Sequence, residues 1–169
     1  MSIAEGLTLF HGEDSKTTET VVDMMNEITV KVKRIENGQL PTKGSAGAAA
    51  WDLYARVTCT VKAGDPPMLV PLGFQMEIPD GYHAKVLPRS STGLKTPVRM
   101  ANSCGIIDSD YRGEVMMIAE AVREDWHIMA GDRVAQMLIE KNEPVVLVES
   151  DELSDTVRGS GGFGSTGKR

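Results

Sequence analysis

Residues 74–87 read Phe-Gln-Met-Glu-Ile-Pro-Asp-Gly-Tyr-His-Ala-Lys-Val-Leu, and they contain two short runs in which apolar and polar side chains alternate. Successive side chains of a β-strand point to opposite faces, so a period of two is typical of half-buried strands. Pro79, Asp80 and Gly81, which separate the runs, favour a turn. The stretch therefore predicts two β-strands joined by a turn.

The same alternation recurs along most of the chain, with turn-forming residues such as Gly131 and Asp132 between the runs. No long stretch has the 3.6-residue period of an amphipathic helix, so the sequence predicts an all-β core. Besides the two runs quoted above, the predicted strands are Ile28–Val32, Leu53–Val57, Thr58–Lys62, Cys104–Ile107, Glu114–Ala119, Val134–Ile139 and Val145–Val148.

The composition of the 169 residues fits one globular domain, with 41% hydrophobic and 25% charged residues. No run approaches the roughly 20 apolar residues that cross a bilayer, and the acidic N-terminus lacks the basic start of a secretory leader. The formal net charge is −6 without a basic stripe, so we expect no binding to duplex nucleic acid. Cys59 and Cys104 stand apart from each other and from the histidines, which predicts two core thiols rather than a disulfide or a zinc site.

The chain divides into three regions. Residues 1–27 form an acidic extension, and its apolar residues from Val21 to Ile28 are spaced as one helical face. Residues 28–157 contain the predicted strands and form the core, and residues 158–169 form a glycine-rich C-terminal arm. Most of the net negative charge lies in residues 1–30, which contain six acidic residues and one lysine.

The C-terminal arm is the first candidate for binding chemistry. Glycines let the backbone wrap its N–H groups around an anion, while Ser165 and Thr166 add hydroxyl groups and Arg158 adds a positive charge. Residues 162–168 match most of a Walker phosphate loop, but Arg169 replaces the required Ser or Thr, so we reject that interpretation. The alternative for this composition is a flexible tail.

Two other segments contain side chains suited to binding phosphate. Residues 88–95 place Arg89, Ser90 and Ser91 after a predicted strand, where a guanidinium, hydroxyls and backbone N–H groups can hold a phosphate. A polar turn with an arginine salt bridge explains them equally well. In residues 131–139, Gln136 is the polar residue of an apolar run, for which a hydrogen-bonded strand glutamine is the simpler interpretation.

Residues 102–116 contain two apolar runs around a tight polar turn, a pattern that predicts a β-hairpin. Asp108 stands where the first run ends, and we interpret it as a catalytic carboxylate. The alternative is that Asp108 and Asp110 form a metal-binding pair, although an Asp-x-Asp in a turn usually bonds to nearby amides.

Together with Gly44–Ala55, these four segments resemble, in order and spacing, the five motifs of the homotrimeric dUTP pyrophosphatase (dUTPase) family over about residues 28–167. The resemblance implies a jelly-roll-like β-barrel, or β-clip, that forms a trimer in which each active site collects residues from all three subunits. It also implies hydrolysis of dUTP to dUMP and pyrophosphate with Mg²⁺. This activity would keep uracil out of DNA and supply dUMP for thymidylate synthesis, in the cytoplasm of a bacterium or a phage-infected host.

The resemblance also gives roles to individual residues. Asp108 resembles the carboxylate that activates the water attacking the α-phosphorus, and Tyr111 resembles the ring that packs on deoxyribose and rejects a 2′-hydroxyl. Mg²⁺ is expected on the triphosphate, with Asp52 acting through water, because no carboxylate cluster provides a protein cage. The other residues expected to bind substrate are Asn102, Gly105, Ile106, Ile107 and Met116 for uracil, Arg89, Ser90, Ser91, Gly93 and Gln136 for the phosphates, and Arg158, Phe163, Gly164, Ser165 and Thr166 on the closing arm.

Two other functions remain open. A dCTP deaminase of the same fold needs a catalytic glutamate on the strand that follows the polar turn. Ten residues beyond Asp108 stands Ile118, and Glu120 lies two positions further along the same strand face. A regulatory protein that uses a dUTPase-like body to bind a protein partner would dock through the acidic extension.

Overall fold

The computed structural model describes residues 27–162. The helical face expected before Ile28, and the arm residues from Phe163 onward, therefore lie outside the described residues. No helix among residues 27–162 is long and apolar enough to cross a membrane. The elements in chain order are β1 (Lys31–Arg34), β2 (Thr42–Lys43), β3 (Trp51–Tyr54), β4 (Cys59–Val61), β5 (Met68–Pro71), β6 (Phe74–Glu77), β7 (Tyr82–Pro88), α2 (Ser90–Lys95), β8 (Val98–Met100), β9 (Gly105–Ile107), β10 (Met116–Ala121), β11 (Trp126–Ile128) and β12 (Arg133–Lys141).

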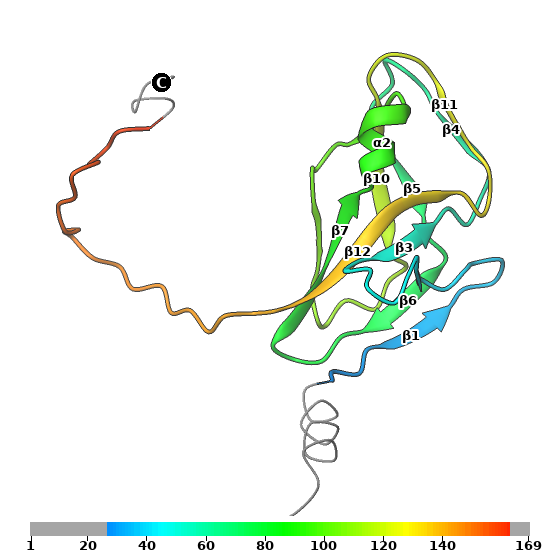
Figure 1. Ribbon diagram of the computed structural model, residues 1–169. Helices are drawn as coiled ribbons and strands as arrows, with labels where there is room; N and C mark the ends of the chain where they lie inside the picture. Colours follow the sequence, from blue (N-terminus) through cyan, green and yellow to red (C-terminus); the bar gives the residue numbers. More distant parts are fainter. Residues whose placement is uncertain (1–26, 163–169) are drawn as a thin grey trace, which may run out of the picture.

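The strands form a jelly-roll-like all-β fold, which confirms the predicted fold class (Figure 1). A five-stranded sheet has the order β2-β3-β12-β7-β9, and a three-stranded sheet has the order β5-β10-β8. Two smaller sheets pair β1 with β6 and β11 with β4. The paired strands run antiparallel, and β12 is the longest partner, aligned with β7 from Ala135 opposite Pro88 to Lys141 opposite Tyr82.

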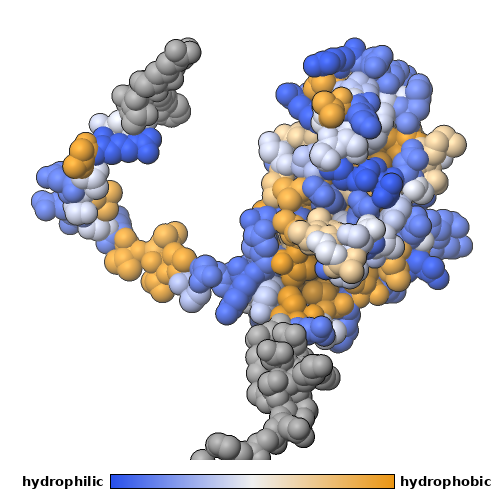
Figure 2. Space-filling model, viewed as in Figure 1, coloured by the Kyte–Doolittle hydropathy of each residue, from blue (hydrophilic) through white to orange (hydrophobic). Residues whose placement is uncertain are grey.

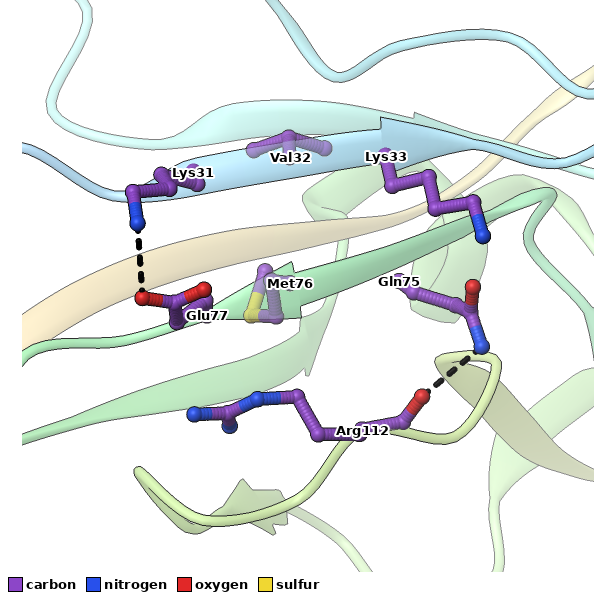
Figure 3. A pocket seen from close by; sticks show the side chains of 7 residues that line it. All are labelled: Lys31, Val32, Lys33, Gln75, Met76, Glu77 and Arg112. Carbon is purple, nitrogen blue, oxygen red and sulfur yellow. Dashed lines mark hydrogen bonds and ion pairs between the residues drawn. The ribbon is translucent and has the colours of Figure 1, made fainter.

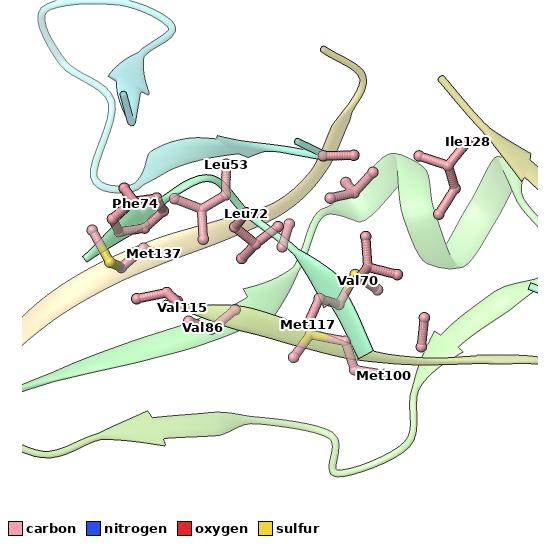
Figure 4. Packing of buried hydrophobic residues seen from close by; sticks show 14 of the residues in the cluster. Leu53, Val70, Leu72, Phe74, Val86, Met100, Val115, Met117, Ile128 and Met137 are labelled. Atoms are coloured by element: carbon pink, nitrogen blue, oxygen red, sulfur yellow. The ribbon is translucent and has the colours of Figure 1, made fainter. Parts of the chain in front are cut away.

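The core is filled by the inward-facing side chains of both larger sheets and of β6 (Figure 4). Alternation explains which residues these are, because β10 buries Met117, Ala119 and Ala121 while the residues between them stay half-exposed. Burying a large aliphatic or aromatic side chain contributes about 1.5–3 kcal/mol. The largest fully buried side chains are Phe74, Leu53, Leu72, Met117, Ile128, Val61, Val70, Val86, Val115 and Val134.

Glu114, in the segment that precedes β10, is joined to the loop between β3 and β4 by an ion pair and to the turn between β5 and β6 by a hydrogen bond. Glu114 accepts hydrogen bonds from Arg56 Nε at 2.8 Å and Arg56 Nη2 at 3.0 Å, and from the backbone N–H of Gly73 at 2.9 Å. Gly73 has φ of +80° and its Cα lies against Gly38, so a side chain there would be strained and would clash with the backbone. The bonds from Arg56 hold the pKa of the Glu114 carboxyl below its usual value.

Two strand predictions are wrong. Residues 102–116 do not form a hairpin, because β9 pairs with β7 whereas β10 pairs with β5 and β8, so the intervening loop crosses between sheets. Val145–Val148 is not a strand, since residues 142–162 pair with no described strand and, beyond Asn142, which still bonds to Gly81, extend away from the body (Figure 1). Among residues 27–162 no strand covers its apolar side chains, and Leu147 is 94% exposed.

The short elements β2, β5, β8, β11 and α2 were not predicted from the sequence. Helix α2 lies where the sequence predicts a polar turn. It has only six residues, and so short an element shows no helical period in the sequence. The expectation of two core thiols is half right. Cys59 packs against the core and burial raises the pKa of its thiol, but both Cys59 and Cys104 are only half-buried.

Candidate active site

A pocket of about 320 Å³ opens where β9 and β10 diverge. This volume lies within the usual range for small-molecule sites. All five residues expected to read the base line it, together with Asp108 and Tyr111. The lining residues are Leu69, Asn102, Gly105, Ile106, Ile107, Asp108, Tyr111, Glu114, Met116 and Ile118.

Strand β9 gives this pocket a wall of backbone groups. It is the edge strand of the five-stranded sheet, paired on one side only, with Ala84 opposite Ile107 and Val86 opposite Gly105. Along such an edge, alternate peptide groups point away from the partner strand and stay free to bond to a ligand. Asn102, just before β9, adds a side-chain amide with both a donor and an acceptor.

The loop between β9 and β10 holds Tyr111 in one orientation. Its hydroxyl donates to the carbonyl of Glu114 at 3.0 Å, and its backbone N–H donates to the carbonyl of Asp108 at 3.2 Å. The ring lies directly over Gly113, where a Cβ atom would overlap the ring and hydroxyl atoms. Glycine at this position therefore lets the ring of Tyr111, which is 43% exposed, lie against the loop.

A second group of expected site residues lies at the other end of the five-stranded sheet. Asp52, on β3, accepts a hydrogen bond from Arg89 Nε at 2.9 Å on one oxygen and one from Arg133 Nη1 at 3.0 Å on the other. The Nη1 group of Arg89 also donates to Ser91 Oγ at 3.3 Å. Gln136, on β12, donates to the carbonyl of Pro88 at 3.0 Å. Three of the five sequence segments thus meet at one place.

These contacts match the simpler interpretations of the segments as well. Arg89 does form a salt bridge, and Gln136 does bond to a neighbouring strand. The convergence of an arginine, a serine, an amide and a carboxylate on the start of α2 is what the separate segments did not reveal. Arg133 lies in the segment 131–139, three residues before Gln136, but the sequence pattern did not single it out.

Within one chain the two groups are far apart. Asp108 follows Ile107, which is level with Ala84 on β7, whereas Arg89 lies five residues further along the same extended stretch. Asp108 lies one residue beyond Ile107 on the side away from Arg89, so at about 3.3 Å per residue this separation is more than about 16 Å. A single copy therefore does not bring the carboxylate of Asp108 to the guanidinium of Arg89.

The described part of the C-terminal arm is also remote from both groups. Arg158 is exposed on the extended segment 142–162, and its Nε donates to the carbonyl of Gly161 at 2.8 Å (Figure 1). Among residues 27–162 no group of three His, Cys, Asp or Glu side chains is placed to hold a metal ion. Neither Asp52 nor Asp108 thus lies in a described protein cage for a metal.

Two other hollows lie outside these groups. One, of about 460 Å³, follows β1 and β6, and its polar side chains bond to each other: Lys31 to Glu77 at 2.9 Å and Gln75 to the carbonyl of Arg112 at 2.8 Å (Figure 3). The other is an apolar groove of about 620 Å³ at the base of the body. Figure 2 shows apolar surface both on the body and on the extended segment 142–162. The apolar groove is lined by Ile28, Thr29, Val30, Val32, Leu40, Pro41, Lys43, Ala49, Trp51 and Ile139.

The dUTPase family model matches residues 36–167, which include all five sequence segments and both groups described above. The chain belongs to the dUTPase family. It is 44% identical over 143 residues to the deoxyuridine 5′-triphosphate nucleotidohydrolase of Rickettsia felis, a match that covers 82% of this chain and 96% of the relative. The enzyme of the same name from Rickettsia typhi is 41% identical over 148 residues, covering 85% of this chain and 99% of the relative. The chain is thus an enzyme of the dUTPase family.

Solved dUTPase structures share the fold. The dUTPase of Staphylococcus bacteriophage 80alpha with dUpNHpp superimposes with a TM-score of 0.74 at 22% identity, over 82% of this chain and 98% of the phage protein. A dUTPase from phage phi11 of S. aureus, described with a structural Mg(II) ion, gives a TM-score of 0.67 at 20% identity, over 74% of this chain and 98% of that one.

Glu120, the glutamate that a dCTP deaminase would need, does not line the pocket. Met116 and Ile118 line the pocket from β10, but Glu120, the next residue on that face, does not. Its carboxylate instead accepts a hydrogen bond from Arg99 Nε at 2.8 Å on the neighbouring strand β8. Glu120 is therefore engaged on the sheet surface rather than facing a bound base.

Proposed function

We propose that this dUTPase hydrolyses dUTP to dUMP and pyrophosphate, with Mg²⁺ carried by the triphosphate and with Asp108 as the general base. The observation that carries the proposal is the pocket between β9 and β10, which places the carboxylate of Asp108 beside an edge strand and an oriented tyrosine. The residue types around it suit a nucleoside on one side and an attacking water on the other.

Selection of uracil follows from the free backbone groups of β9. Uracil presents one N–H donor between two carbonyl acceptors, which peptide groups and the Asn102 amide can satisfy. Cytosine presents the reverse pattern at its exocyclic position, and each buried group left without a partner costs about 1–3 kcal/mol. Half-buried Met116 and Ile118 leave little room for the 5-methyl group of thymine.

Selection of deoxyribose follows from the position of Tyr111. Its ring is held over Gly113 by the bond from its hydroxyl to the Glu114 carbonyl. A flat ring packed on the sugar offers no partner to a 2′-hydroxyl and occupies the space that this group needs. A ribonucleotide would therefore lose both packing and a hydrogen bond to water.

The chemical step needs one base and compensation of negative charge. Asp108 accepts a proton from water, the water oxygen bonds to the α-phosphorus, and the bond from that phosphorus to the bridging oxygen breaks, so that pyrophosphate leaves. A positioned general base typically contributes about 10²–10⁴-fold to the rate. The remaining acceleration comes from orienting the phosphates and offsetting their charge.

The group at the start of α2 supplies that charge compensation. Arg89, the hydroxyls of Ser90 and Ser91, the backbone near Gly93 and the amide of Gln136 would hold the phosphates. Both oxygens of Asp52 already accept hydrogen bonds from guanidinium groups, which favours contact with Mg²⁺ through water over direct ligation. Bound Mg²⁺ would neutralise charge on the phosphate oxygens.

A homotrimer with shared sites accounts for the separation of the two groups. A neighbouring copy can bring its Arg89 group to the Asp108 pocket, which one chain cannot do over about 16 Å. The extended segment 142–162 supports association, because Val146 and Leu147 are 85% and 94% exposed and need a covering surface. The apolar groove beside the unpaired edge of β1 offers such a surface on another copy. Arg158 and the arm residues Phe163, Gly164, Ser165 and Thr166 would then close over a site of the neighbour.

The base assignment is tested by Asp108→Asn, with Asp110→Asn as the matched control in the same turn. We expect the first variant to lose about 10²–10⁴-fold in kcat while it binds dUpNHpp normally, and the second to keep its activity. Near-normal turnover by Asp108→Asn would exclude it as the base. Equal losses in both variants would instead favour the alternative metal-binding pair.

Sharing of the site is tested by mixing inactive subunits. Asp108→Asn and Arg89→Gln chains are unfolded in urea, mixed in equal amounts and refolded together. If each site takes the two residues from different copies, about one quarter of the sites in random trimers contain both intact residues. Activity near that fraction of wild type supports the trimer, and a mixture as inactive as its components contradicts it.

A further inference from the structure

Arg133 contacts both Asp52 and Arg89 in the group at the start of α2 that is proposed to hold the phosphates. It is the first residue of β12, and its guanidinium donates to Asp52 Oδ2 at 3.0 Å. Its backbone carbonyl, in turn, accepts a hydrogen bond from Arg89 Nη1 at 3.2 Å. Arg133 thus contacts the carboxylate that holds Arg89 and also Arg89 itself.

The local backbone explains how one residue makes both contacts. Pairing of β12 with β3 shifts between Arg133 and Ala135, so Val134 is an extra residue in a β-bulge. A bulge bends its strand and changes the direction of neighbouring groups. Here the carbonyl of Val134 accepts a hydrogen bond from Thr92 Oγ1 at 3.3 Å, which ties the bulge to α2.

We propose that Arg133 is a positioning residue, which fixes the Asp52 carboxylate and, through it, the Arg89 side chain that contacts the triphosphate. This inference rests on the proposed function. The side chain of Asp52 is 16% exposed and that of Arg89 is 22% exposed, so their geometry is set by protein contacts rather than by water. With each carboxylate oxygen bound to a different guanidinium, the carboxylate plane cannot rotate without breaking one bond.

Charge gives Arg133 a second effect on the same group. Arg89 and Asp52 alone would be neutral together, which would make a weak site for a triphosphate on a chain whose net charge is −6. The second guanidinium leaves the group of three with one positive charge. The Nη2 donors of Arg89 are engaged by no residue among those described, so they remain available to a phosphate oxygen.

The test compares binding of dUpNHpp and of deoxyuridine, which lacks phosphates, to wild type and to Arg133→Gln by calorimetry. We expect about tenfold weaker binding of dUpNHpp, unchanged binding of deoxyuridine, and a KM for dUTP raised by about the same factor. In an Asp52→Asn background Arg133→Gln should weaken dUpNHpp binding less than about threefold, because the loss of the Asp52 carboxylate has already broken the link between the Arg133 and Arg89 side chains. Arg99→Gln, the same charge change in the exposed pair with Glu120, is the control and should bind both ligands as wild type does.

Three results would overturn the proposal: unchanged dUpNHpp binding in Arg133→Gln, equal weakening for deoxyuridine, or full additivity with Asp52→Asn. If Arg133→Gln does not fold, Arg133→Lys takes its place in the test. It retains the charge without the fork, so we expect about threefold weaker dUpNHpp binding, and wild-type affinity would overturn the proposal. A wild-type protein that fails to bind dUpNHpp would reject the proposed function and this inference together, whereas failure of the inference alone leaves wild-type binding intact.

Discussion

The ion pair of Arg56 and Glu114 shows how the core supports the Asp108 pocket. The Glu114 side chain is 13% exposed, accepts three hydrogen bonds, and stands next to the pocket, where its own carbonyl receives the Tyr111 hydroxyl. Glu114→Gln keeps the shape of the side chain and removes its charge. One of its oxygens becomes an NH₂ donor that faces the Arg56 guanidinium, so two donors oppose each other.

The expected cost follows from burial on both sides of the pair. Removing one partner of a fully buried pair costs about 3–5 kcal/mol, because the other charge is left uncompensated. The Arg56 side chain is 26% exposed, so water relieves part of this penalty, and the Gln oxygen can keep the bond from Gly73. We therefore expect the free energy of unfolding to fall by about 2 kcal/mol. The matched change Glu120→Gln, whose partner Arg99 is 65% exposed, should lower it far less, because water screens an exposed pair.

The pH dependence of this loss has a defined sign. The pKa of Glu114 is lowered in the folded protein, so its carboxylate stabilises the fold above the ordinary glutamate pKa of about 4.3. That stabilisation disappears as the pH falls through the lowered folded-state pKa. Urea denaturation at one protein concentration, from pH 7 downward, should show wild type and Glu114→Gln converging in acid. A difference at pH 7 no larger than that of Glu120→Gln, or one that is constant with pH, would refute the reasoning.

Three further predictions concern the sugar, the assembly and the arm. Gly113→Ala should displace the Tyr111 ring and reduce the preference for dUTP over UTP about tenfold, measured as the ratio of kcat/KM values; an unchanged ratio would contradict the role of the ring. Leu147→Asp, at a side chain 94% exposed in one chain, should dissociate the proposed trimer in sedimentation while circular dichroism shows an intact fold, and a stable trimer would contradict burial of this segment by a neighbour. Truncation before Arg158 should leave a folded trimer whose kcat/KM is at least about 10²-fold lower than that of wild type. Full activity would exclude a closing arm.

Much of the strand content could be predicted because a period of two is a local property. The runs at Phe74–Ile78 and Tyr82–Leu87 became β6 and β7 almost residue for residue. Which strands pair is not local, so residues 102–116 resembled a hairpin although their two strands belong to different sheets. Val145–Val148 has the composition of a strand but has no partner strand in the part of the chain that the structure describes.

In the candidate site, too, some residues can be recognised from local sequence and others only from contacts in the fold. Asp108, Tyr111, Arg89 and Gln136 were identified because they stand in recognisable motifs. The roles of Arg133 and Glu114 come from contacts that cross the sheets, and Arg133 is 81 residues from Asp52 in the chain. Sequence spacing alone also gave no indication that the Asp108 pocket and the Arg89 group lie at opposite ends of β7.

Hydrolysis of dUTP is tested most directly by product analysis. The pure protein and Mg²⁺ are mixed separately with dUTP, dCTP, dTTP and UTP, and the pyrophosphate and nucleotide formed are identified. We expect pyrophosphate and dUMP from dUTP alone, which would establish the reaction and both selectivities. Deaminated product from dCTP would reassign the chemistry to the deaminase, and no product from any of the four would contradict the proposed function.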